Sequence, residues 1–280
     1  MSEELRYTIV DGIKCYSPEE ANRYADYPDD GFDVTDKLEE GSFWVRSRNR
    51  LLKKIINNYS LQFNNARVLE IGCGTGAFIR EIVQNRNLRI TGSEIYLKGL
   101  LYAKKKLPNV EFIQFDARQG KLAEKFDIIA AFDVIEHIDD DISAISNVYQ
   151  MVSDGGYFIV TVPQYMFLWS RLDEIVKHKR RYSKNELLIK LQRQGFAINF
   201  CSSFLFVLFP LMLISRMLDR QKNAVDSSEM EFENRVKFSK ALNWIFDKLM
   251  RIDEVLIERR MSLPFGGSLV VVAQKQKIEP

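Results

Sequence analysis

Residues 68–76 read Val-Leu-Glu-Ile-Gly-Cys-Gly-Thr-Gly, an apolar run that ends in a carboxylate and passes directly into three alternating glycines. The apolar run predicts a buried strand, and residues 77–85 have the apolar spacing of a helix. Glycines at such a turn let the backbone approach a ligand without obstruction by a Cβ atom. The free N–H groups that begin a helix favour an anionic ligand group. The stretch therefore predicts a strand–turn–helix unit that binds a nucleotide-like ligand.

Short apolar runs alternate with helical stretches on both sides of this turn. We expect strands at 67–71, 88–93, 110–115, 126–132 and 157–162, and helices at 77–85, 97–106 and 141–151. This alternation indicates βαβ units, and hence an α/β fold with a doubly wound parallel sheet between two layers of helices. Ligands of such sheets bind at the carboxyl ends of the strands.

The regions that flank this core are less regular. Residues 1–40 read as an irregular arm and 41–59 as an amphipathic helix. Later elements are a helix at 183–194, a strand at 196–201, apolar helices at 204–218 and 232–257 around a polar linker at 221–229, and a strand at 269–273. We therefore divide the chain into an N-terminal arm with a cap helix (1–60), a core (61–202 and 264–280) and a helical insertion (203–263). The insertion is expected to be an acceptor lid, a membrane-facing surface or a dimer contact.

Composition excludes several classes of protein. The 280 residues are 46% hydrophobic and 28% charged, which is typical of a globular protein with a core. A net charge of +2 argues against nucleic acid as a partner. Cys15, Cys73 and Cys201 are too widely spaced for a disulfide framework or a zinc ribbon. Because no secretory signal or membrane-spanning run is found, we expect a cytoplasmic protein that is able to associate with a membrane surface.

Carboxylates also follow the neighbouring strands. Glu94 ends the second predicted strand, Asp116 the third, and Asp133 follows the fourth. A carboxylate after the second strand can accept hydrogen bonds from both ribose hydroxyls. One after the third strand can accept from an adenine amine. Polar groups at four successive strand ends indicate one ligand site rather than separate solvated carboxylates.

In combination, these motifs resemble those of class I S-adenosylmethionine-dependent methyltransferases. Residues 68–76 resemble motif I, and residues 92–94, 115–117, 126–129 and 154–157 resemble the later motifs in order and spacing. The resemblance covers about residues 43–162 and implies S-adenosyl-L-methionine as the cofactor. It also implies a Rossmann-like seven-stranded sheet whose last strand, here 269–273, is antiparallel.

By the same resemblance, Glu70 and the glycines hold the methionine part of the cofactor, Glu94 the ribose, and Asp116 with Ala117 the adenine. The expected cofactor residues are Arg48, Glu70, Gly72, Cys73, Gly74, Thr75, Gly76, Glu94, Ile95, Asp116, Ala117, Phe132 and Asp133. The alternative is an NAD(P)-dependent oxidoreductase, whose fingerprint G-x-G-x-x-G differs from the G-x-G-x-G spacing here. A cofactor-binding scaffold without activity is a further alternative.

The two histidines of the chain both lie where an acceptor is expected. His137 follows the fourth strand, and His178 lies in a basic loop after the fifth. We predict that His137 and His178 are catalytic, as general bases toward a substrate hydroxyl, because imidazole titrates near neutral pH. The alternative is that His137 packs locally and His178 is a surface residue.

A metal site is an alternative use of the same residues. The run from Asp133 to His137, D-x-x-E-H, is similar to the E-x-x-E-H motif of small-RNA 2′-O-methyltransferases, in which a later histidine completes a magnesium site. It is also similar to ubiquinone-biosynthesis O-methyltransferases. A site formed by Asp133, Glu136, His137 and His178 would lower the pKa of acceptor oxygens. Because Asp reaches less far than Glu, our main prediction contains no metal, and a metal-assisted RNA 2′-O-methyltransferase is the alternative.

The acceptor is expected to contact the loop after the fifth strand. This loop carries the basic residues Lys177, Lys179, Arg180, Arg181 and Lys184. We expect Trp169, Arg180, Arg181 and Tyr182 to bind the substrate, through phosphate or carboxylate groups. The apolar run 204–214 is either a buried cap or dimer helix, or a lipid-facing lid. The sequence thus predicts O-methylation of a small amphipathic or anionic acceptor, such as a lipid-linked sugar or a quinone-like molecule.

Overall fold

The computed structural model describes residues 6–23, 27–28, 31–38, 41–219 and 238–277. The described strands form one sheet in the order β1-β2-β5-β4-β3-β6-β7-β9-β8. Its parallel centre consists of β3 (Ala66–Ile71), β4 (Leu88–Glu94), β5 (Glu111–Gln114), β6 (Phe126–Phe132) and β7 (Val152–Pro163). Strand β9 (Ser268–Lys275) lies antiparallel between β7 and β8 (Phe196–Phe204).

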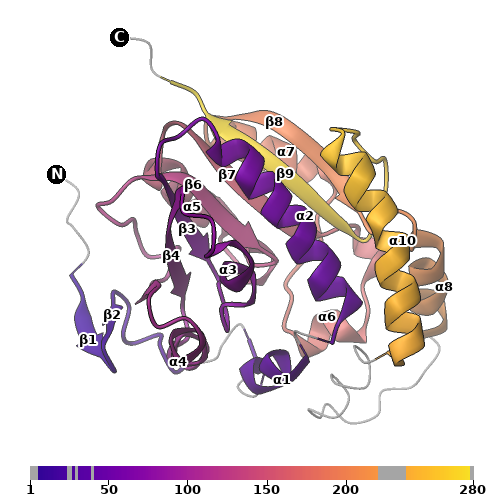
Figure 1. Cartoon of the computed structure of the whole chain (residues 1–280), viewed down its shortest axis with the longest axis horizontal. Coiled ribbons are helices and arrows are strands. Elements are labelled where there is room, and N and C mark those ends of the chain that lie inside the picture. Colours follow the sequence, from indigo (N-terminus) through magenta and orange to yellow (C-terminus); the bar gives the residue numbers. More distant parts are fainter. Residues whose placement is uncertain (1–5, 24–26, 29–30, 39–40, 220–237, 278–280) are drawn as a thin grey trace.

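Helices cover both faces of this sheet, as Figure 1 shows. Successive residues of β3, Val68 and Leu69, belong to opposite apolar layers because side chains alternate along a strand. The layer around Val68 includes α2 (Phe43–Ser60) and α10 (Lys240–Glu258), and the layer around Leu69 includes α5 (Asp141–Met151) and α7 (Lys184–Arg193). Burial on both faces explains why the central strands are almost continuously apolar.

The remaining described helices are shorter than α2 and α10. They are α1 (Gly31–Leu38), α3 (Ala77–Ile82), α4 (Leu97–Lys106), η1 (Ile135–His137), η2 (Met166–Leu168), α6 (Arg171–Ile175) and α8 (Phe209–Asp219). Among all the described residues, no helix is both long and apolar enough to cross a membrane.

The Rossmann-like α/β fold with an antiparallel strand from the end of the chain is confirmed, but the sheet has two more strands than expected. They come from the segment predicted to be an irregular arm. Strands β1 (Thr8–Val10) and β2 (Ile13–Cys15) form a hairpin, and β2 adds in parallel to β5. Asp11 and Gly12 form the turn with φ values of 49° and 71°, which the two-residue turns of tight hairpins require.

Both C-terminal helices begin later than expected: α10 starts at Lys240, although residues 238–239 were expected to be helical. Phe204 was expected to begin a helix, but it pairs with Ser268 as the end of β8, and α8 begins at Phe209. The predicted linker 221–229 and residues 232–237 of the predicted second helix lie outside the described residues. The division of the chain into arm, core and insertion stays a prediction.

Candidate active site

A cavity of about 260 Å³ lies at the carboxyl ends of β3, β4, β5 and β6. Residues from α1 and α2 also line it, among them Phe32 and Val45. All expected cofactor residues except Gly76 line this cavity: Arg48, Glu70, Gly72, Cys73, Gly74, Thr75, Glu94, Ile95, Asp116, Ala117, Phe132 and Asp133. Of the two predicted catalytic histidines, His137 lines it as well.

The three glycines of the turn all have a positive φ but differ in the space available for a Cβ atom. Gly72 has φ of 71°, and an added Cβ atom would lie 2.4 Å from Cγ2 of Val134. Gly74 has φ of 52°, but an added Cβ would meet no protein atom within 4 Å. Gly76, with φ of 82°, precedes α3 and packs against α4, where an added Cβ would lie 3.1 Å from that of Ala103. Gly76 therefore shapes the turn without lining the cavity.

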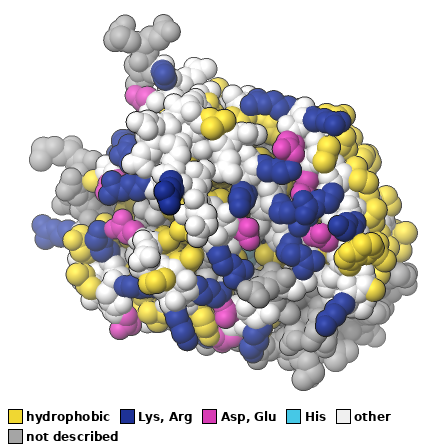
Figure 2. All heavy atoms as spheres, viewed as in Figure 1, with side chains coloured by type: hydrophobic (Ala, Val, Ile, Leu, Met, Phe, Trp, Pro, Cys, Tyr) yellow, Lys and Arg dark blue, Asp and Glu magenta, His cyan; other side chains and the backbone are white. Residues whose placement is uncertain are grey.

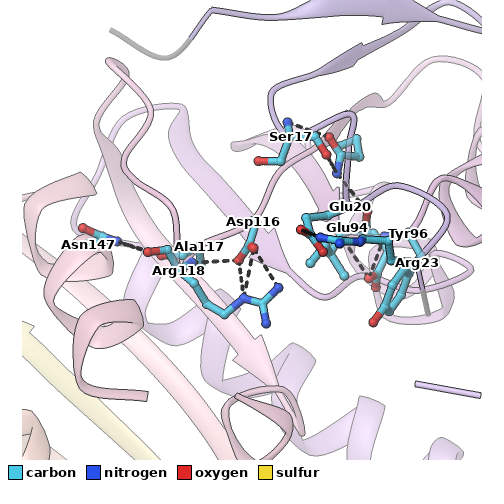
Figure 3. Close-up of polar contacts among 11 residues, drawn as sticks. Ser17, Glu20, Arg23, Glu94, Tyr96, Asp116, Ala117, Arg118 and Asn147 are labelled. Atoms are coloured by element: carbon cyan, nitrogen blue, oxygen red, sulfur yellow. Dashed lines mark hydrogen bonds and ion pairs between the residues drawn. The ribbon is translucent and has the colours of Figure 1, made fainter. Parts of the chain in front are cut away.

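Glu94 ties the end of β4 to the glycine turn. One of its carboxylate oxygens, Oε1, accepts from the backbone N–H groups of Ile95 and Tyr96, at 2.8 and 3.3 Å. The other, Oε2, accepts from the N–H of Gly74 at 3.2 Å. Burial raises the pKa of Glu94, and these backbone donors oppose that rise. A carboxylate held in this way keeps its position beside the turn (Figure 3).

Asp116, which follows β5, forms an ion pair with Arg118 (Figure 3). Nη2 of Arg118 lies 2.8 Å from Oδ2 of Asp116, whose side chain is 3% exposed. Arg118 lines the cavity but was not among the predicted site residues. Asn147 of α5 fixes the same segment by donating to the carbonyl oxygen of Ala117 at 2.8 Å.

Asp133 and Arg48 form a second ion pair beside the cavity. Nη1 of Arg48, on α2, lies 2.7 Å from Oδ2 of Asp133. Asp133 has φ of 57°, a left-handed conformation that is uncommon outside glycine and often occurs at functional sites. Arg48 was expected to contact the cofactor, and in this structure its guanidinium is directed at Asp133.

His178 is held by a buried carboxylate. Its Nδ1 atom lies 2.8 Å from Oδ1 of Asp173, which also accepts from Nε of Arg181 at 2.8 Å. Burial opposes ionisation of Asp173, but the hydrogen bond from His178 and the charge of Arg181 hold its pKa below the usual range. An ionised Asp173 requires the proton of His178 on Nδ1. The other ring nitrogen, Nε2, is then directed toward Glu136, with 3.8 Å to Oε1.

Glu136, which precedes His137 in η1, carries a fully buried carboxyl group. Neither of its side-chain oxygens has a hydrogen-bond partner in the part of the chain that the structure describes. Burial together with the charge of Asp133 raises its pKa well above the usual range. The rings of His137 and His178 are 4.7 Å apart, in an edge-to-face arrangement. Among the described residues, Glu136, His137 and His178 offer ligand atoms within 4.8 Å of one another, in a group that does not include Asp133.

Comparison with known proteins identifies the family of the chain. The family model described as "Methyltransferase domain" matches residues 44–199, more than half of the chain. The chain belongs to this methyltransferase family. A protein of Mycolicibacterium smegmatis named "Probable S-adenosylmethionine-dependent methyltransferase" is 25% identical over 58% of this chain and 62% of its own length. The family match decides between the two cofactor classes that the glycine spacing left open, in favour of S-adenosylmethionine.

Two further curated relatives are named O-methyltransferases. Malonyl-[acyl-carrier protein] O-methyltransferase 1 of Ilyobacter polytropus is 27% identical over 52% of this chain and 58% of its own length. Ubiquinone biosynthesis O-methyltransferase of Pseudomonas fluorescens is 30% identical over 32% and 41%. The chain thus spans between 41% and 62% of the length of the relatives described here.

Solved structures share the fold at low sequence identity. Phosphoethanolamine N-methyltransferase 2 of Haemonchus contortus, in complex with S-adenosyl-L-methionine, has a TM-score of 0.58, with 16% identity over 92% of this chain and 60% of that one. The [4+2]-cyclase SpnF has a TM-score of 0.55, with 18% identity over 84% of each chain. Because a cyclase shares the fold, the fold alone does not determine the acceptor chemistry of this methyltransferase.

The predicted substrate residues of the methyltransferase are not among those that line the cavity. Tyr182 is fully buried and donates from its hydroxyl to Asp141 at 2.6 Å. Arg181 is buried against Asp173. Arg180 donates to the carbonyl oxygen of Asp139 at 2.9 Å, and Trp169, at the end of η2, is half-buried.

Proposed function

We propose that this methyltransferase transfers a methyl group from S-adenosylmethionine to an oxygen atom of a small amphipathic or anionic acceptor. The observation that carries the proposal is His137, which lines the cavity and packs against His178, with Asp173 holding His178 in one orientation. Oxygen as the acceptor atom is supported by the two relatives that are named O-methyltransferases.

The two histidines and Asp173 have separate proposed roles in removing the acceptor proton. When bound, S-adenosylmethionine supplies an activated methyl group, so the protein has to position the acceptor and remove its proton. We assign proton removal to His137, because its side chain lines the cavity. His178 lies against His137 and is held by Asp173. We propose that His178 and Asp173 together orient His137 and stabilise the positive charge that His137 gains.

For the cofactor, we assign Glu70 and the glycine turn to the methionine part, Glu94 to the ribose, and Asp116 with Ala117 to the adenine. These roles are taken from the family resemblance and are supported by the shared cavity. Since Asp116 already accepts from Arg118, an adenine amine has to share or replace this ion pair. Burial keeps the thiol of Cys73 protonated by raising its pKa, so we assign no chemistry to it.

For the acceptor, we assign the anionic group to Arg180, whose side chain is 25% exposed and also pairs with Asp141 at 3.3 Å. Trp169 is proposed to contact the apolar part. Arg181 and Tyr182 are buried in hydrogen-bonded networks, so we propose that they act by holding Asp173 and Asp141.

We expect a phenol that carries a prenyl tail and a free ring hydroxyl to accept label from methyl-labelled S-adenosylmethionine. A water-soluble catechol without the tail should accept less, because it lacks the apolar part. Label in each extracted product, located by mass spectrometry, measures the outcome. Label that enters phosphoethanolamine while both hydroxyl acceptors stay unlabelled would show that the acceptor atom is nitrogen.

A metal-assisted reaction is the second candidate, and the buried Glu136 favours it. A buried carboxyl group that has no hydrogen-bond partner among the described residues is costly, whereas a cation beside it would use both of its oxygens. The carboxylate behind His178 is also the partner that metal-binding histidines commonly have. Two imidazoles and one carboxylate suit Zn²⁺, Mn²⁺ or Fe²⁺ better than Mg²⁺.

Chelation separates the two candidates. If a histidine removes the proton directly, treatment with EDTA followed by its removal should leave turnover within about twofold of the untreated protein. Turnover of the treated protein, with and without added Mn²⁺ or Zn²⁺, is the measurement. A loss that Mn²⁺ restores in the parent but not in Glu136→Gln would establish the metal-assisted reaction instead.

A further inference from the structure

Helices α8 and α10 expose apolar side chains at helical spacing. On α8, Leu211, Ile214 and Met217 are each at least half exposed. On α10 the exposed apolar residues include Trp244, Ile245, Ile252 and Val255, and Trp244 is 62% exposed. Figure 2 shows hydrophobic side chains gathered along the edge where these two helices lie. We call these seven residues the apolar face.

The charges of α10 are sorted between its two sides. Three of its acidic residues are turned inward: Asp247 and Glu254 pair with Arg50 of α2, and Asp253 accepts from two backbone N–H groups in the turn that precedes α8. The exposed side carries Lys248 and Arg259 instead, and Arg251 is exposed as well but pairs with Glu254 at 3.5 Å. Glu258 is also exposed, but it pairs with Lys54. The surface around the apolar face is therefore positively charged.

We propose that the apolar face and its basic rim bind the surface of a bilayer that contains anionic lipids. An apolar helix side beside Lys and Arg is the pattern of helices that lie in the membrane interface. Tryptophan prefers the same depth, and Lys248 lies 5.8 Å from the ring centre of Trp244, so the two can meet headgroups together. The positive rim is complementary to anionic lipid.

A second copy of the chain fits this face less well. A symmetric dimer would place the same patch against itself, which brings the basic rims of the two copies together. Like charges opposed across an interface are unfavourable. The sorting of charges on α10 therefore favours a negatively charged partner surface over self-association.

The apolar face lies next to the part of α2 that lines the cavity. At the start of α10, the side chain of Asn243 accepts from the N–H of Phe43, and Phe246 packs on the ring of Phe43. The same first turns of α2 carry Val45 and Arg48 into the cavity wall. An acceptor with a lipid tail would reach the cavity from this side. This extension rests on the proposed function, but the binding of lipid to the apolar face does not.

Flotation with vesicles tests the inference without any acceptor. The parent protein should float with vesicles of phosphatidylcholine mixed with phosphatidylglycerol, and less with phosphatidylcholine alone. The double change Trp244→Glu and Ile252→Glu should reduce partitioning by roughly a hundredfold, because two apolar side chains no longer enter the interface. Lys248→Glu should reduce it by roughly tenfold or more.

Leu101→Glu is the matched control, since Leu101 is 41% exposed on α4, away from α8 and α10, and this variant should float like the parent. Circular dichroism and calorimetry with S-adenosylmethionine check that each variant is folded and binds the cofactor. Failure of the parent to float with anionic vesicles would overturn the inference. Equal flotation of the parent and the double variant would also overturn it. A third contrary outcome is a dimer in sedimentation that Trp244→Glu dissociates, with no flotation of either protein.

Discussion

Replacing His137 with alanine is expected to lower turnover by about two to four orders of magnitude, the range that a positioned general base contributes. The imidazole of His137 lines the cavity and lies against that of His178, whose Nδ1 atom is held by Asp173 at 2.8 Å. Affinity for S-adenosylmethionine should change little, because the carboxylates assigned to the cofactor are not altered. Steady-state kinetics and calorimetry on the same preparation measure both quantities.

The position of His178 gives this prediction its control. His178→Ala should also lower turnover, but by less than His137→Ala, because His178 is not among the residues that line the cavity. If His178→Ala has the larger effect, the roles of the two histidines are reversed. If neither change lowers turnover by more than about threefold, proton removal by histidine is wrong.

Most of the sheet could be predicted because its strands carry their own signals. Continuous apolar runs such as 126–132, separated by helical spacing, are typical of strands buried on both faces. The hairpin of β1 and β2 also had a local signal, since Asp11-Gly12 stands between β-branched residues. The hairpin is too short to show as a period within residues 1–40, which are rich in Asp, Glu, Tyr and Pro.

The acceptor side could be predicted less well because its contacts join residues far apart in sequence. His178, Arg181 and Tyr182 read as one run in the sequence, yet in the structure they meet two different buried carboxylates. Arg181 and His178 converge on Asp173, and Tyr182 reaches Asp141 of α5. A run of charges does not reveal which members are paired with buried carboxylates, so the sequence suggested four acceptor contacts where two of the side chains are buried.

The side of α10 that is exposed is another feature that the sequence left open. The helix has one side with acids and another with apolar and basic residues, and either could face the core. Arg50 of α2 decides the orientation, because it pairs with Asp247 and Glu254. This choice turns Trp244 and Ile252 outward.

Replacing Glu94 with alanine is expected to weaken binding of S-adenosylmethionine by roughly two to four orders of magnitude. Hydrogen bonds to a charged group each contribute about 1.5–3 kcal/mol, and the proposed role of Glu94 is to accept two from the ribose. The change also removes the acceptor of the Gly74 N–H, so the glycine turn loses an anchor at the same time. Calorimetry with the parent and the variant measures the loss.

Two controls separate contact with the ligand from a general loss of structure. Glu111→Ala removes an exposed carboxylate that pairs with Lys14 at the start of the neighbouring strand β5, and it should bind the cofactor like the parent. Since burial raises the pKa of Glu94, the ionised form is present above that pKa, so affinity should fall as pH drops through it. Parent affinity that is independent of pH in the acidic range, with Glu94→Ala binding normally, would place the ribose elsewhere. If Glu94→Ala loses cofactor affinity and also has a lower melting temperature than the parent, Glu94 acts by holding the turn rather than by contacting the ribose.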